Sequence, residues 1–223
     1  MRHDVQVAQA LSALRRLLIG RRSPPVTGAG DLVQLLAEQT AYVTQRTVIE
    51  YCRARSGLNW DKLFAEPLFV ERLEVCRWDG YAIVLAEVAE LVLIRLRRDG
   101  TADPEDYLPG LVRAAQAALR RHPVPAHRAS WSDAEGAIER HLARALLAAP
   151  RPVHLVGFQS ADAVFELLPI HEGLRRQDQE MFQNSLRFAI CGVFEEISRR
   201  VDVAALEAAL IAADGDPGGP AAP

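Results

Sequence analysis

The sequence predicts an all-α protein, an irregular bundle of seven or eight helices, and three observations support this fold class. Apolar residues recur at helical spacing in almost every segment. Glycine and proline stand between those segments, where helices end. Strand-like alternation of apolar and polar residues is missing, apart from residues 152–158, which could form a short extended segment.

The composition is that of a globular protein. Of 223 residues, 49% are hydrophobic and 25% are charged. A chain of this length can bury enough surface to fold without a disulfide or a structural metal. We therefore expect a single helical domain over residues 1–213. Residues 214–223 contain only Asp, Gly, Pro and Ala, so we expect a disordered tail there.

The first three helices are defined by apolar spacing and by the breakers around them. Val7, Leu11 and Leu14 share one face of a first helix, expected within residues 1–22. A second helix is expected over 31–56, because Gly57 suits a C-terminal stop. Pro67 suits the first turn of a third helix, expected over 67–98.

The later helices are predicted from capping residues. Asp103 followed by Pro104 suits a helix start, with the aspartate as N-cap. Ser132 followed by Glu135 forms a capping box. Ser160 and Asp202 are the expected caps of two further helices. The predicted ranges are 103–122, 132–150, 160–168, 173–200 and 202–214.

The segment 81–98 is predicted to be the central helix of the bundle. Tyr81, Val84 and Leu85 lie on one side of it, and Ile83 and Leu93 lie on the others. A helix that is apolar nearly all round is usually buried by neighbours on every side. We expect the other helices to pack around this one.

Glu87 and Glu90 interrupt the apolar surface of this central helix. They are three residues apart and therefore share one side. If they are buried, they need cationic or hydrogen-bonding partners, and they become candidates for acid–base chemistry or for binding a small molecule or a cation. The alternatives are a place at the solvent edge or structural pairing with arginine.

Two further helices carry polar faces. Tyr51 continues a hydroxyl stripe that could line a polar cavity, although threonines more often bond to their own helix; the other members are Thr40, Thr44 and Thr47. On the late helix, Asn184, Arg187 and Phe188 share a face with Cys191. Arg187 could hold a carboxylate or phosphate, or pair with an acidic side chain of the protein.

These positions define one candidate ligand site, formed by Glu87, Glu90, Tyr51, Asn184 and Arg187. A site of this kind predicts a closed pocket of a size typical for small ligands, several hundred cubic ångströms. No set of residues has the spacing of a metal motif, because Glu-x-x-His and Cys-x-x-C are both absent, and no cofactor is indicated.

The first helix is basic as well as amphipathic. Arg15, Arg16, Arg21 and Arg22 surround its C-terminal end. Such a helix can dock into a protein partner or make weak peripheral contact with an anionic membrane. The alternative is that it packs on its own domain.

Several function classes are disfavoured. The net charge of −3 gives no basic excess, and no compact helix-turn-helix is present, so nucleic-acid binding is not expected. Neither a nucleophile elbow nor a phosphate-binding loop occurs. The three cysteines are isolated and fit buried thiols in a reducing cytoplasm. Lys62 is the only lysine against many arginines, a bias typical of GC-rich bacterial genes.

The sequence therefore favours a non-catalytic helical module for protein interaction or assembly, with self-association among its modes. The alternative function is a ligand-binding or catalytic helical bundle with a buried carboxylate site. Whether any catalysis occurs is open at this point.

Overall fold

The computed structural model describes residues 23–213, and within this range it is helical without any strand. The predictions for the N-terminal segment 1–22, with Arg15, Arg16, Arg21 and Arg22, and for the tail 214–223 lie outside the described residues. The helices are α2 (Ala29–Thr44), α3 (Glu50–Ser56), α4 (Trp60–Leu63), α5 (Pro67–Asp99), α6 (Pro104–Arg120), α7 (Ser132–Leu147), α8 (Phe158–Glu166), α9 (Glu172–Arg175), α10 (Gln179–Arg200) and α11 (Val203–Ala212).

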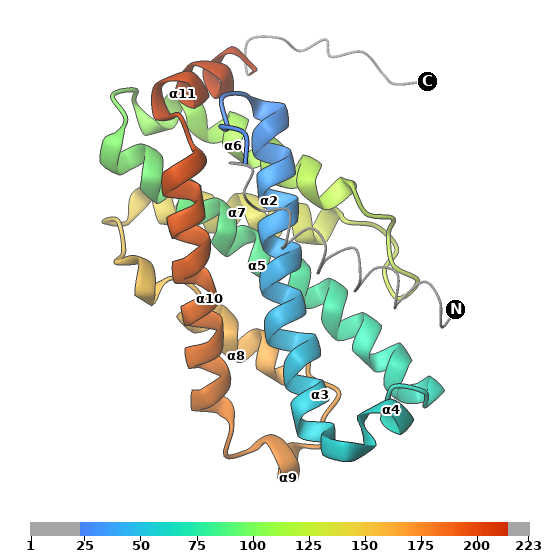
Figure 1. Cartoon of the computed structure of the whole chain (residues 1–223). Coiled ribbons are helices and arrows are strands. Elements are labelled where there is room, and N and C mark those ends of the chain that lie inside the picture. The colour runs from blue at the N-terminus through green and yellow to red at the C-terminus, as the bar shows by residue number, and fades with distance from the viewer. Residues whose placement is uncertain (1–22, 214–223) are drawn as a thin grey trace.

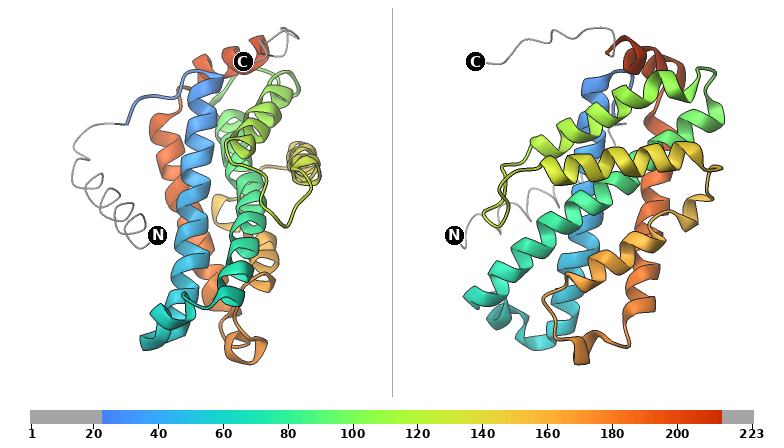
Figure 2. Two further views of the ribbon diagram at one scale, coloured as in Figure 1. Left: turned by 90° about the vertical axis from the view of Figure 1, so that its right-hand side faces the viewer. Right: turned by 180° about the vertical axis from the view of Figure 1, so that it is seen from behind.

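Helix α5 is the centre of the bundle, as predicted. It packs against α2, α6, α7, α8, α10 and α11. Helices α2 and α10 run along one side of it, while α6 and α7 cross it on the opposite side (Figures 1 and 2). Every residue from Val84 to Ile94 is buried, including both glutamates. The all-round apolar surface of this segment thus reflects neighbours on all sides.

The predicted helix 31–56 is a continuous helical run with a π-helical turn inside it. The turn covers Gln45–Ile49 and joins α2 to α3. Thr47 lies in this turn, and its hydroxyl donates to the carbonyl of Val43 at 2.8 Å. A π-turn inserts an extra residue into the helix. Apolar spacing alone did not predict this insertion.

Several predicted boundaries are wrong. The late helix begins at Gln179 rather than near 173, after the separate short helix α9. Gly157, not Ser160, is the N-cap of α8. Trp131 takes the N-cap position of α7, so Ser132 forms no capping box. Residues 153–155 form a 3-10 turn instead of an extended segment.

The two ends of the described chain meet at one place. Val26 forms an isolated parallel bridge with Val201. The N–H of Val26 donates to the carbonyl of Arg200 at 2.8 Å, and the N–H of Asp202 donates back to Val26 at 3.1 Å. Asp202 also caps α11, as predicted, by accepting from the N–H of Ala205 at 3.2 Å.

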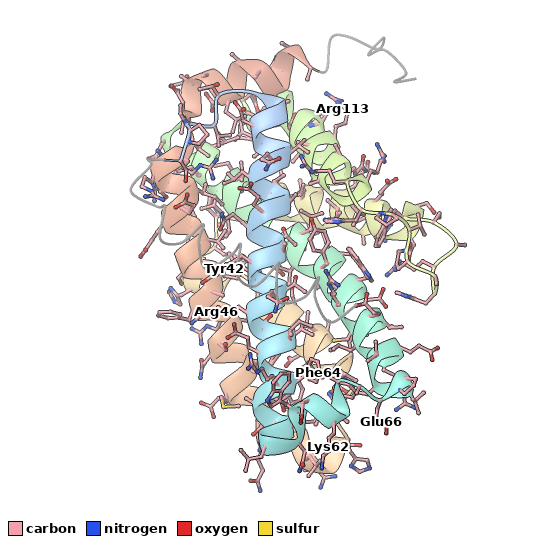
Figure 3. All side chains as sticks on the ribbon, turned by 45° about the vertical axis from the view of Figure 1, so that its right-hand side comes forward. Tyr42, Arg46, Lys62, Phe64, Glu66 and Arg113 are labelled. Carbon is pink, nitrogen blue, oxygen red and sulfur yellow. The ribbon has the colours of Figure 1, made fainter. Side chains whose placement is uncertain are left out.

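The opposite end of the bundle is built from α3, α4 and the start of α5. Figure 3 shows Lys62, Phe64 and Glu66 there, while Tyr42 of α2 and Arg46 of the π-helical turn lie higher up. Leu58, in the 3-10 turn Gly57–Asn59, is fully exposed. No helix among residues 23–213 is both long enough and apolar enough to cross a membrane.

Candidate functional site: a buried carboxylate and histidine cluster

Glu87 and Glu90 are both buried in the middle of α5. Their exposed fractions are 3% and 2%, so the alternative that they mark a solvent edge is wrong. Buried carboxylates are very costly unless other groups compensate their charge. The two side chains should therefore have partners on the helices that cross α5 at this level.

Glu90 is held by two cationic or hydrogen-bonding side chains from outside α5. His141 of α7 brings its Nε2 within 2.7 Å of Oε2. Arg151, in the connection between α7 and α8, donates its Nε to Oε1 at 3.0 Å and its Nη2 to Oε2 at 2.5 Å. This fork-like arrangement is the strong bidentate geometry of an arginine and a carboxylate.

Glu87 is held by the first turn of α8. The backbone N–H of Gly157 donates to Oε2 at 2.9 Å, and the hydroxyl of Ser160 donates to Oε1. Gly157 has a φ of 80°, a left-handed conformation that glycine adopts most readily. The glycine thus lets the chain turn sharply and direct its N–H at the carboxylate.

The partners of Glu90 keep it ionised. Burial alone would raise its pKa, but the hydrogen bonds from His141 and Arg151 outweigh burial and hold the pKa below its ordinary value. The hydrogen bond with Glu90 in turn raises the pKa of Arg151. The pair is therefore fully charged at neutral pH.

Glu87, Glu90 and His141 together form a set of possible metal ligands. Each offers one ligand atom, and these atoms lie within 4.8 Å of one another. Ligand atoms at about 2.1 Å from a common ion lie about 3–4 Å apart, so small side-chain rotations would bring this set around one ion. Among the described residues this is the only such group of histidine, cysteine and acidic side chains.

A very small cavity adjoins the cluster. It is about 10 Å³ in volume, at the lower limit for one water molecule. Its lining includes Glu90, Arg97, Ala145 and Arg151. The predicted closed pocket of several hundred cubic ångströms is therefore not present at the carboxylates. The space suits a single ion or water, not an organic ligand.

Tyr51, predicted to join the carboxylates, belongs to a different buried cluster. Its hydroxyl donates to Asp178 Oδ2 at 2.8 Å, and Arg55 binds the same carboxylate. Thr40 and Thr44 are buried without a hydrogen-bond partner among the described residues. The hydroxyl stripe of α2 and α3 thus faces the core, and only its last member takes part in a polar network.

Asn184 and Arg187 lie on the outer side of α10. Arg187 donates its Nε to the carbonyl of His154 at 2.8 Å and its Nη1 to Asn184 at 3.2 Å. Phe188 beside them is 73% exposed. The opposite face of α10 is buried, as predicted, and comprises Phe182, Leu186, Ala189, Val193 and Ile197. The two faces of this helix are therefore confirmed, but its polar face contacts the 3-10 turn near 154.

The candidate site contains two side chains that the sequence did not reveal. His141 lies 51 residues from Glu90, and Arg151 lies 61 residues away. Neither follows a spacing rule, because they meet Glu90 only through the crossing of α7 over α5. The Pro-Arg-Pro run at 150–152 was the one available signal, since it marks an arginine held in a restricted connection.

Comparisons with protein-family models, with curated proteins and with solved structures gave no match to this chain.

Proposed function

We propose that this protein binds one divalent transition-metal ion through Glu87, Glu90 and His141. The observation that carries the proposal is the convergence of these three side chains, from α5 and α7, within the buried middle of the bundle. A buried carboxylate site is the alternative function predicted from the sequence.

The charges and donor types favour such an ion. Two carboxylates carry a charge of −2, and a divalent cation would neutralise them completely. A neutral imidazole with two carboxylates suits Zn²⁺, Mn²⁺ or Fe²⁺. Mg²⁺ and Ca²⁺ prefer sites made of oxygen ligands alone, so they should bind more weakly here.

The surroundings also favour an ion over a larger ligand. The adjoining cavity of about 10 Å³, which Glu90 borders but Glu87 and His141 do not, has space for one water-sized group beside Glu90. Three protein ligands leave at least one coordination position for a water molecule.

The test is calorimetric titration of the full chain with ZnCl2 and with MnCl2. We expect saturable binding of one ion per chain, weakened at least about tenfold by Glu87→Gln or His141→Gln. Glu139→Gln is the matched control, because Glu139 is an exposed acid two residues before His141 on the same helix. Circular dichroism checks that each variant is folded. Absence of binding, or equal loss in the control, would contradict the proposal.

A second candidate function keeps the predicted interaction module, as self-association through the outer face of α10. The observation that favours it is Phe188, a 73% exposed aromatic side chain flanked by Asn184 and Arg187. Aromatic and arginine side chains dominate the energetics of interfaces, and a single face can pair with its own copy about a two-fold axis.

Light scattering after size-exclusion chromatography tests this second candidate. We expect a dimer that Phe188→Glu dissociates. Leu147→Glu is the matched control, since Leu147 is an equally apolar, 87% exposed side chain on α7. A monomeric wild-type chain would exclude self-association as the function.

A further inference from the structure

We infer that Arg151 is a built-in counter-cation that the metal ion replaces, so that metal binding releases the connection between α7 and α8. This inference rests on the proposed function and adds its regulation. Four observations support it: the contacts of Arg151, its place in the chain, the balance of charge and the cavity beside it.

The contacts of Arg151 use the oxygens that a metal would need. Its Nε and Nη2 bind Oε1 and Oε2 of Glu90, and His141 binds Oε2 as well. A metal ion at Glu90 and a guanidinium on the same two oxygens would repel each other and compete for the same lone pairs. Arg151 therefore opposes binding of the ion, and its departure would free these lone pairs and remove the repulsion.

The position of Arg151 at the surface allows its side chain to leave Glu90. It lies between Pro150 and Pro152, outside any helix, and its side chain is 35% exposed. Among the described residues, no backbone hydrogen bond is donated by residues 149–151. The side chain can turn to solvent without breaking a turn of helix or a backbone ladder.

The charge balance favours the exchange. Arg151 offsets only one of the two negative charges of Glu87 and Glu90, whereas a divalent ion offsets both. Glu87 is otherwise satisfied by neutral donors, the N–H of Gly157 and the hydroxyl of Ser160. When the divalent ion takes the place of Arg151, the net charge of the ion and the two buried carboxylates is zero.

The cavity shows where the exchange would begin. It lies at the contact of Glu90 with Arg151 and is bordered by Ala145, Ala148 and Pro150. Arg97 donates to the carbonyls of Ala145 and Ala148, each at 3.0 Å, and so fixes the end of α7. Movement would therefore be confined to the stretch after Ala148, where Arg151 would become a surface group.

Titration with ZnCl2 alone tests the competition. We expect Arg151→Gln to bind Zn²⁺ about tenfold more tightly than the wild-type chain, and Arg151→Lys to lie between them. Arg97→Gln is the matched control, because Arg97 borders the same cavity and touches neither carboxylate in the described contacts. The affinity of Arg97→Gln for Zn²⁺ should stay within about twofold of that of the wild-type chain.

The Nε–H resonance of Arg151, assigned by its loss in Arg151→Gln, gives a second measurement. In the metal-free protein we expect this N–H to be protected from exchange with solvent. When diamagnetic Zn²⁺ is bound, we expect its chemical shift to become that of a solvent-exposed arginine. If wild type and Arg151→Gln bind Zn²⁺ equally, or the resonance stays protected, the exchange is refuted while the metal site stands. If neither chain binds Zn²⁺, the proposed function and the exchange both fail.

Discussion

The carboxylate of Glu87 accepts a hydrogen bond of 2.9 Å from the backbone N–H of Gly157, and this contact joins the middle of α5 to the start of α8. Ser160, in the first turn of α8, donates its hydroxyl to the same carboxylate. The first N–H groups of a helix lack partners within the helix, and a negative charge there is favourable. Glu87 thus caps a helix that lies 70 residues later in the chain.

Glu87→Ala should destabilise the metal-free protein. The change leaves a buried N–H and a hydroxyl without their acceptor, which costs about 1–3 kcal/mol. Glu87→Gln keeps one acceptor oxygen and should cost less. Urea unfolding followed by circular dichroism measures both free energies. If Glu87→Ala lowers the free energy of unfolding by less than about 0.5 kcal/mol, the contact does not stabilise the fold.

Gly110→Ala should destabilise the contact between α6 and α11. A Cβ at this position would lie 2.3 Å from the backbone carbonyl oxygen of Leu210, so the two helices must move apart. Overpacking of this kind costs about 1–3 kcal/mol. The control is Gly192→Ala on α10, where nothing lies within 4 Å of the added Cβ. That change should stabilise the protein by about 0.5–1 kcal/mol, as thermal unfolding can show.

The contribution of Asp178 to stability should depend on pH. The hydrogen bond from Arg55, aided by Tyr51, lowers the pKa of Asp178 below its usual value despite desolvation. Its stabilising effect is therefore complete above the unfolded pKa of about 3.9 and is lost as the pH falls through the lower folded pKa.

Asp178→Asn provides the measurement. The difference in unfolding free energy between wild type and this variant should be constant from about pH 5 to pH 7 and should shrink below about pH 4. Acidic groups elsewhere titrate in both proteins and cancel in the difference. A difference that grows with falling pH would contradict the assignment.

The three cysteines should differ in reactivity. Burial raises the pKa of Cys52 to about 12 and also raises the pKa of Cys76, whereas Cys191 is partly exposed. The thiolate is the reactive form. We expect Ellman's reagent at pH 8 to modify Cys191 in the native protein and the other two only after unfolding. Rapid modification in the Cys191→Ser variant would show that a buried thiol is accessible.

The sequence predicted the central helix because the evidence for it is local. Val84 and Leu93 point in opposite directions from one helix, and only neighbours on both sides can bury them both. The sequence singled out Glu87 and Glu90 on that helix but left open whether they are buried, and the structure shows that both are. The partners of these glutamates could not be predicted, because the crossing of two helices that are distant in the sequence produces no periodic pattern in either segment.

The start of α8 shows why local rules failed elsewhere. Ser160 looked like an N-cap, since serine is favoured there. In the structure the cap position belongs to Gly157, and the accepting oxygen comes from Glu87 on another helix. A cap supplied by tertiary contact cannot be read from the residues around the helix start.

The bridge between Val26 and Val201 has a consequence for synthesis of the protein. The two residues stand near opposite ends of the described chain, yet the start of α2 is held by the last turn of α10 through hydrogen bonds. A chain emerging from the ribosome cannot make this contact until almost all of residues 23–201 have left the exit tunnel. Closing so long a loop adds an entropic cost. The bundle should therefore reach its final stability only after translation has passed α10, with the earlier helices held as a partly formed intermediate.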